Sequence, residues 1–453
     1  MSNFKEFKNR STEKSAENSH RLKILKAIST YEEKVDKTKS DQFIDWETAK
    51  NKASKIKEYA INNLPDLLIE FEKNITEHGI KVLWASDKNE ARQYVLNIAN
   101  QHNAKKIVKS KSMTTEEINF NEFCETKGLE VIESDLGELI VQLAGEKPYH
   151  IVTPAMHKSK NEISKLFAEK LGSVESDSAE ELTMIAREHL RYKYTSADIG
   201  VTGANFLIAD TGAVSLTENE GNIRLSSSCP PVHIVIAGIE KILPRITDLS
   251  FFLPLLATSG TGQQITGYNS IFKGPKNRDE IDGPEYMYVI LLDNGRSNLY
   301  SDPELRESLK CIRCGACLNA CPVYRTIGGH SYNTTYQGPI GSVITPHLKN
   351  DSNWNHLSSA SSLCGACTQV CPVGIDIHQL LLLNRNRDKS TLFWNIFLKA
   401  WSAVMSNRKV LNFSSKSGSY LRNILKMALP KNIKKRIPQM AKKSFSELWD
   451  ENE

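Results

Sequence analysis

Seven of the nine cysteines in this 453-residue chain lie between residues 311 and 371, in two motifs of regular spacing. The first motif is C-x2-C-x2-C-x3-C-P and the second is C-x2-C-x3-C-P, and they comprise Cys311, Cys314, Cys317, Cys321, Cys364, Cys367 and Cys371. The first spacing is that of bacterial iron–sulfur proteins, in which three close thiolates bind one cluster and the fourth, before proline, binds the other. The sequence therefore predicts two iron–sulfur clusters and a role as an electron relay.

The same rule predicts how the cysteines divide between the clusters. The first cluster is expected to be bound by Cys311, Cys314, Cys317 and Cys371, and the second by Cys321, Cys364 and Cys367. A structural zinc site is the alternative, but C-x2-C pairs alone explain neither the third cysteine of the first motif nor the proline after each motif. The other two cysteines, Cys124 and Cys229, are expected to be small buried hydrophobic residues.

The second motif departs from the first at one position. Alignment of the two motifs places Ser361 where Cys311 stands, so the second cluster has only three cysteine ligands. We expect two [4Fe–4S] clusters, in which Ser361, water or another side chain completes the second. A [3Fe–4S] cluster at the second site remains an alternative.

The elements that must position these cysteines change in character along the chain. Residues 1–75 read as polar amphipathic helices that form an N-terminal extension. In residues 76–300, short apolar runs alternate with helical patterns, which predicts an α/β domain with a largely parallel sheet. Residues 301–388 show only helical patterns around the cysteines, and residues 389–453 form a basic amphipathic tail.

Small polar residues at predicted strand ends suggest a second site, because an α/β sheet binds ligands at the carboxyl ends of its strands. The candidates are Lys109, Ser110, Lys111, Ser112, Gly203, Ala204, Asn205, Asp210, Thr211, Gly212, Glu218, Asn219, Glu220, Gly221 and Asn222. Such a site would suit a carboxylate or phosphate, with Glu220 as its acid, and the alternative is ordinary turn chemistry. His330, near the first motif, is expected to be packed or hydrogen-bonded rather than a ligand.

Charge is distributed unevenly in a chain of formal net charge +5. Residues 385–443 contain 15 Lys and Arg against one acid, which suggests contact with an anionic partner or with lipid headgroups. Six apolar residues recur there at helical spacing, namely Phe393, Ile396, Phe397, Ala400, Trp401 and Val404. Such a helix either docks on a partner or membrane, or closes the core of its own domain. The chain begins without a signal-peptide pattern, and its longest apolar run, residues 249–257, is too short to span a bilayer.

Several segments together resemble the lactate utilization protein B family, the iron–sulfur subunits of a bacterial three-protein system that oxidises L-lactate. The resemblance rests on residues 105–122, 150–158, 197–225, 282–298, 311–332 and 361–373, including GGHSY and ADTGAVSL. It implies a lactate-utilization α/β domain, related in fold to NagB/RpiA-type isomerases and CoA transferases, followed by an all-α helical ferredoxin domain. It also implies two partners, a cysteine-rich-domain subunit and a second lactate-utilization-domain subunit.

The expected function is therefore that of an iron–sulfur electron-transfer subunit in a cytoplasmic complex that oxidises L-lactate to pyruvate. The chain has no recognisable flavin or nicotinamide signature, so we do not expect it to be a complete enzyme, and its catalytic residues are unknown. Two alternatives stay open: a subunit that passes electrons from another hydroxy acid to a quinone pathway, with contact at the inner membrane face, and a redox-sensing regulator that binds a metabolite. No DNA-binding motif is present, and no nucleic-acid partner is expected.

Overall fold

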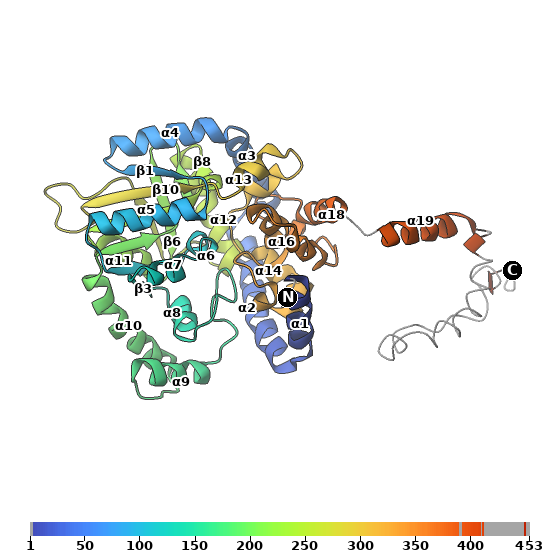
Figure 1. The fold of residues 1–453 in the computed structure, drawn as a ribbon, viewed down its shortest axis with the longest axis horizontal. Coiled ribbons are helices and arrows are strands. Elements are labelled where there is room, and N and C mark those ends of the chain that lie inside the picture. The colour runs from blue at the N-terminus through green and yellow to red at the C-terminus, as the bar shows by residue number, and fades with distance from the viewer. Residues whose placement is uncertain (1–2, 389–391, 409, 412–447, 450–453) are drawn as a thin grey trace. The chain divides into compact units, whose positions relative to one another are not determined.

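The computed structural model describes residues 3–388, 392–408, 410–411 and 448–449 (Figure 1). It divides into two units, residues 1–387 and 388–453, which are described separately. The chain begins with four helices: α1 (Asn3–Ala16), α2 (Asn18–Gln42), α3 (Trp46–Asn62) and α4 (Leu64–Glu77). Asp45 caps α3 by accepting a hydrogen bond from the amide of Glu47.

A six-stranded, all-parallel sheet forms the centre of the α/β region. Its order is β1-β10-β7-β4-β2-β3, with β1 (Lys81–Ala85), β2 (Lys106–Lys109), β3 (Glu130–Glu133), β4 (Ile199–Thr202), β7 (Val232–Gly238) and β10 (Tyr286–Leu292). The central strand β7 is buried along its whole length, as its run of apolar residues requires. The prediction of an α/β domain with a parallel sheet is confirmed.

Alternate side chains of the strands point to opposite faces of this sheet, and a separate core covers each face. Ile234 and Ile290 pack in the core that includes Val95 of α5 (Lys88–Gln101), whereas Val235 and Val289 pack with Phe71 of α4. Figure 1 shows these two helices on opposite sides of the sheet. The remaining helices of this region are α6 (Met113–Glu117), α7 (Phe120–Thr126), α8 (Leu136–Leu143), α9 (Lys160–Leu171), α10 (Ala179–Ser196), α11 (Asn222–Ser228) and α12 (Leu249–Thr261), with two 3₁₀ turns, η1 (Ile239–Lys241) and η2 (Ile246–Asp248).

A second, four-stranded sheet has the order β8-β5-β6-β9. Its strands are β5 (Phe206–Ile208), β6 (Ala213–Glu218), β8 (Ile242–Leu243) and β9 (Tyr268–Phe272). Residues 206–218 form an antiparallel hairpin of β5 and β6. Its turn contains Gly212 at a φ of +56°, where a Cβ atom would lie 2.2 Å from the backbone nitrogen of Ile75. The hairpin therefore packs directly on α4.

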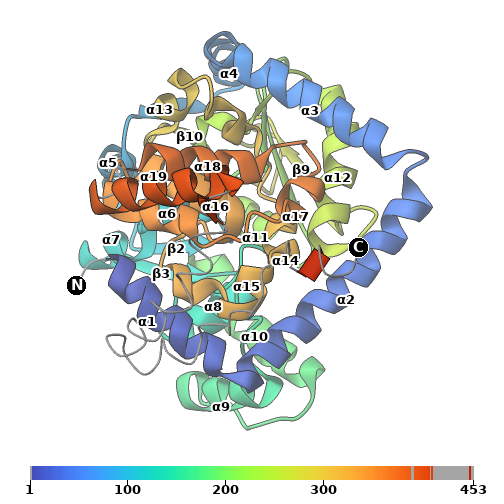
Figure 2. The ribbon, with the colours of Figure 1, turned by 90° about the vertical axis from the view of Figure 1, so that its right-hand side faces the viewer.

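After the last strand, the described residues up to Arg387 form only helices and turns. These are α13 (Arg296–Ser301), η3 (Arg306–Lys310), α14 (Ala316–Ala320), α15 (Pro322–Ile327), η4 (Gly329–Tyr332), α16 (Gly338–Leu348), η5 (Ser352–Ser359), α17 (Ala366–Gln369) and α18 (Ile377–Arg387). Figure 2 shows α1, α2 and α3 running around this region, and α1 packs against α15, η4 and η5. One hydrophobic core includes Ala53 of α3, Phe206 of β5 and Leu318 of α14, so the helical region is continuous with the rest of the unit.

The two cysteines outside the motifs differ in exposure. Cys124 is fully buried, as expected, but Cys229 is exposed because it follows the last residue of α11 at the surface, so the prediction for Cys229 was wrong.

In the second unit, α19 spans Leu392–Ser406. Of the predicted apolar face, Ile396, Ala400 and Trp401 are exposed, while the side chains of Phe393 and Phe397 and all of residues 412–447 lie outside the described part. Among the described helices, none has the length and hydropathy needed to cross a bilayer.

Candidate functional site

Four cysteines from both motifs line one cavity in the helical region. They are Cys311, Cys314, Cys317 and Cys371, the set expected for the first cluster. Two backbone amides point at their sulfur atoms: Arg313 N lies 3.4 Å from Cys311 Sγ, and Ile375 N lies 3.4 Å from Cys371 Sγ. Amide donors of this kind stabilise the negative charge of a bound cluster.

The other three cysteines form a second group that reaches the surface. Burial and the nearby charges of Cys321 and Cys364 raise the pKa of Cys367 to about 11. Cys364 itself is exposed, and hydrogen bonds from the amide of Ala366 and from Ser362 lower its pKa. The structure therefore places one cysteine group in the interior and one end of the other group at the surface.

The donor set fits iron–sulfur clusters better than zinc. Burial raises the pKa of Cys371 to about 11, so this thiol stays protonated at neutral pH unless a metal displaces the proton. Two thiolates on one zinc ion, each about 2.3 Å from it, lie at most about 4.6 Å apart. Within the described part of the chain, no three cysteine sulfur atoms all lie within 4.8 Å of one another. The cysteine groups are thus too wide for a single zinc ion.

A pocket of about 390 Å³ lies beside the first cysteine group. Loops that follow β2, β4 and β6 contribute to its wall, which is the arrangement expected at the carboxyl ends of strands. The predicted residues that line it are Lys111, Ser112, Gly203, Ala204, Asn205, Glu218, Asn219, Glu220 and Asn222. Cys314 lines the same pocket, so the strand ends and the first cysteine group face a common space.

Glu220 lines this pocket, and its carboxylate accepts a hydrogen bond from the amide of Leu136 at 3.1 Å. Desolvation of the carboxylate and the negative charge of Asp135 raise the pKa of Glu220 to about 7. The group can therefore hold or release a proton near neutral pH.

Sequence reasoning predicted Lys111 but missed two other cations of the pocket. Lys241 and Arg313 line it, and the guanidinium of Arg313 lies 4.4 Å from the centroid of the Tyr336 ring. Arg313 Nη2 also lies 3.3 Å from Glu240 Oε1. Arg313 lies between Cys311 and Cys314, so the sequence could have indicated that it is near the first cluster site. Lys241 reaches the pocket from the η1 turn, and no motif around it in the sequence predicts this.

Comparisons with known proteins agree with this arrangement. Residues 68–292 match the LUD domain, and residues 307–375 match a 4Fe-4S dicluster domain. Lactate utilization protein B of Bacillus cytotoxicus is 43% identical over 382 residues, covering 83% of this chain and 80% of that protein. The protein of the same name from Geobacillus sp. is 42% identical over 383 residues, with the same two coverages.

The chain belongs to the lactate utilization protein B family. The resemblance seen in the sequence is confirmed, and the interpretation of the cysteine motifs as iron–sulfur motifs is supported by the dicluster match. A solved structure of a DUF162 family protein from Deinococcus radiodurans aligns with a TM-score of 0.29 at 15% identity, over 51% of this chain and 98% of that chain. That value is too low to bear on the fold.

In this lactate utilization protein B family member, the turn that begins the second motif repeats the turn that begins the first. Arg313 and Leu363 have φ of +61° and +55°, and the two glycines after the next cysteines both have φ of +82°. Leu363 N donates to Ser361 Oγ at 3.1 Å, as Arg313 N does to Cys311 Sγ at 3.4 Å. The hydroxyl of Ser361 thus occupies the position equivalent to the thiol of Cys311.

We therefore expect Ser361→Cys to strengthen the binding of one iron in the second cluster, because a thiol loses its proton more easily than a hydroxyl and the resulting thiolate is a softer ligand for iron. The measurement is the EPR signal of the three-iron form after brief exposure to air, which should be smaller in Ser361→Cys than in wild type. Ser359→Cys is the matched control, since Ser359 is an exposed serine at the end of η5, two residues before Ser361, and lies outside the motif. Equal three-iron signals in wild type and Ser361→Cys would show that another group completes the site.

Some predicted site residues lie elsewhere. Asp210, Thr211 and Gly212 form the hairpin turn, and the carboxylate of Asp210 accepts a hydrogen bond from Ile246 N at 3.0 Å. Lys109 is fully buried, with its ammonium 2.8 Å from Glu133, 3.4 Å from Glu116 and 3.6 Å from Glu138. Ser110 is buried beside it and does not line the pocket. The alternative of ordinary turn chemistry is thus correct for Asp210, Thr211 and Gly212, whereas Lys109 belongs to a buried ion-pair cluster, which neither interpretation predicted.

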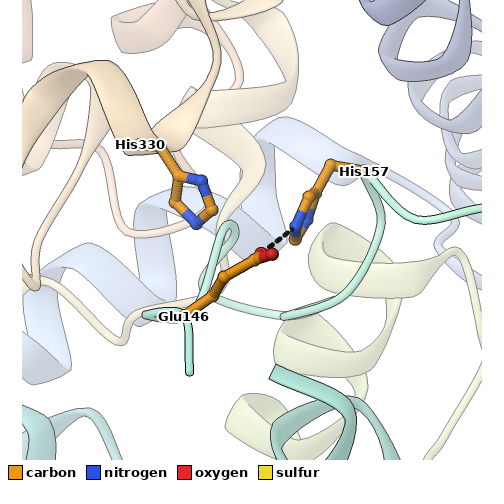
Figure 3. Close-up of side chains that lie close together, drawn as sticks. All are labelled: Glu146, His157 and His330. Atoms are coloured by element: carbon orange, nitrogen blue, oxygen red, sulfur yellow. Dashed lines mark hydrogen bonds and ion pairs between the residues drawn. The ribbon is translucent and has the colours of Figure 1, made fainter. Parts of the chain in front are cut away.

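His330 belongs to a hydrogen-bonded cluster, shown in Figure 3 with Glu146 and His157. Glu146 accepts from His157 Nε2 at 2.7 Å and from Lys158 Nζ at 2.6 Å, and His330 Nε2 donates to the carbonyl of Lys147 at 2.8 Å. Burial lowers the pKa of His157 to about 4, so its ring is neutral at pH 7. The cluster connects the loop before α9 with η4 of the helical region, as expected for a packed and hydrogen-bonded His330.

Proposed function

We propose that this chain is the iron–sulfur electron-transfer subunit of a complex that oxidises L-lactate to pyruvate. The name of its relatives supports the substrate. The observation that carries the role is the placement of the cysteines, which extend from Cys314 at the interior pocket to Cys364 at the surface. Iron–sulfur clusters, when bound, accept and release single electrons. Two crossed clusters in this position would provide a path out of the protein.

The first cysteine group is surrounded by apolar side chains, including Ile151, Leu318 and Ile340. Such a setting shields a cluster from water and from oxygen. The exposed Cys364, by contrast, gives a partner protein direct access to the second site. We therefore propose that electrons pass between the second site and a partner subunit, either the cysteine-rich-domain protein or the second lactate-utilization-domain protein.

The proposal is tested by reconstituting the chain anaerobically with the two partner proteins and measuring lactate-dependent reduction of a dye. We expect reduction only when all three proteins are present, and loss of most of the rate in Cys364→Ala, while Cys229→Ala behaves as wild type. Cys229 is the matched control because it is also exposed but lies outside the motifs. Full dye reduction by the two partners alone would contradict the proposal, and the regulator alternative would then be favoured.

Removal of residues 389–453 should leave the clusters intact, because the segment contains no cysteine and forms a unit separate from residues 1–387. We propose that this basic segment contacts an anionic surface of a partner or a membrane, so the truncated chain should bind partners or anionic vesicles more weakly. In wild type the same association should weaken as salt is raised. Co-sedimentation of the wild-type and truncated chains with the partner proteins, and with anionic vesicles, at low and high salt measures this difference in binding. If truncation lowers the iron content, the segment belongs to the core instead.

A further inference from the structure

The pocket at the strand ends and the cavity of the first cysteine group share a wall. Ile151, Ile312, Arg313 and Cys314 line both spaces. A molecule bound in the pocket would therefore contact side chains that also face the first cluster site. Its charge would change the electrostatic potential at that site.

Two cations that line the pocket, Arg313 and Lys241, lack full partners. The side chain of Arg313 is 9% exposed, and its Nε and Nη1 atoms are buried without a hydrogen-bond partner. Lys241 is 9% exposed and has neither a hydrogen-bond nor an ion-pair partner in the part of the chain that the structure describes. Buried polar groups are nearly always paired, so the free donors of Arg313 indicate an anion that completes them, and Lys241 adds a second positive charge nearby.

The neighbouring carboxylates, Glu240 and Glu117, already form ion pairs with Arg296. Arg296 Nε lies 2.5 Å from Glu240, and Arg296 Nη2 lies 2.7 Å from Glu117. Glu117 also accepts from the hydroxyl of Tyr336 at 2.6 Å. Lys241, Arg313 and Arg296 carry three positive charges against two on Glu240 and Glu117, so this group of residues beside the pocket retains an excess of positive charge.

The pocket is also lined by acidic and polar side chains. Asp135, Glu218 and Glu220 line it, together with hydrogen-bonding groups such as Asn205 and Thr217. A doubly charged phosphate would be repelled by these carboxylates more strongly than a singly charged carboxylate. The polar groups are of the kind that hydrogen-bond a hydroxyl or carbonyl group.

We propose that the pocket binds a small carboxylate, with its anionic group against Lys241 and Arg313, and that its binding is linked to the redox state of the first cluster. An electron added to that cluster brings negative charge close to Arg313, which lines both spaces, so the anion should bind the oxidised protein more tightly than the reduced protein. By linkage, the bound anion should then lower the reduction potential of the cluster. A tenfold difference in affinity corresponds to about 59 mV for a one-electron couple.

The test uses the full-length chain, purified anaerobically with its clusters and oxidised. Calorimetric titrations with L-lactate, pyruvate and inorganic phosphate at constant ionic strength give the affinities, and only the choice of these acids rests on the proposed function. We expect a carboxylate to bind more tightly than phosphate. The carboxylate should bind Lys241→Met more weakly than wild type, by roughly tenfold or more, and should bind Glu220→Gln more tightly. Lys160→Met, which removes an exposed lysine at the start of α9, should bind as wild type.

Redox titration followed by EPR, with and without the carboxylate, tests the linkage. The potential should fall when the acid is present in wild type and should move less in Lys241→Met, at unchanged iron content. Equal binding of the acid by wild type and Lys241→Met, or no binding by either, would overturn the site. Binding of phosphate alone would overturn the assignment to carboxylates, and binding without a change of potential would overturn the linkage. These measurements use this chain alone. The proposed function is tested separately, by dye reduction with the reconstituted complex, so a failure of one can be distinguished from a failure of the other.

Discussion

Replacement of Cys371 by serine is expected to remove the first cluster, although Cys371 lies in the second motif. It lines the same cavity as Cys311, Cys314 and Cys317, and it accepts a hydrogen bond there from Ile375 N. A serine hydroxyl is a poor substitute for a buried thiolate ligand. We expect the chain to lose roughly half of its iron and sulfide, since each of two clusters holds a similar share.

Two further variants make this result specific. Cys229→Ser, at an exposed cysteine outside the motifs, should retain all the iron. Cys367→Ser should instead affect the second cluster, which the EPR spectrum distinguishes by its own signal. If Cys371→Ser and Cys367→Ser lose the same signal, the motifs bind their clusters separately and the crossed assignment is wrong.

The second large effect is expected from Lys109→Met. This lysine is fully buried and lies within 3.6 Å of Glu133, Glu116 and Glu138, whose negative charges raise its pKa. Removal of the lysine leaves buried carboxylates without a cation, which typically costs about 3–5 kcal/mol. Chemical unfolding of the anaerobic protein, followed by circular dichroism, should show the loss. Lys105→Met, at an exposed position before β2, should change the stability little.

The effect should depend on pH in a defined direction. Burial already raises the pKa of Glu133 and of Glu138, and loss of Lys109 raises both further. A carboxyl whose pKa is higher in the folded state than in the unfolded state stabilises the fold below the unfolded pKa, and this contribution is lost as the pH rises through the folded pKa. Lys109→Met should therefore be destabilised more at pH 8 than at pH 5.5. An equal loss at both pH values would show that lost packing, rather than unpaired charge, is responsible.

The sequence predicted the features that depend on local pattern. Strands such as β7 and β10 are continuous apolar runs and could be recognised as buried parallel strands. The cysteine spacing predicted the two groups, and the polar residues after β2, β4 and β6 predicted a pocket at the strand ends.

Features that depend on long-range packing could not be predicted in the same way. Lys109 and Lys111 are two residues apart, but only the fold shows that Lys109 meets three glutamates while Lys111 lines the pocket. The turn at Gly212 resembles a ligand loop in sequence, and its role is set by α4, which packs against it. Lys241 and Arg313 come from segments more than seventy residues apart, so no local pattern connects them.

The central claim is that electrons from lactate reach the clusters of this chain. The most direct measurement is EPR of the oxidised chain, mixed anaerobically with the two partner proteins and L-lactate and then frozen at successive times. We expect signals of reduced clusters to appear only with L-lactate and both partners, and the signal assigned to the first cluster to be absent in Cys371→Ser. If lactate is oxidised by the mixture while the clusters of this chain stay oxidised throughout, the chain does not carry these electrons.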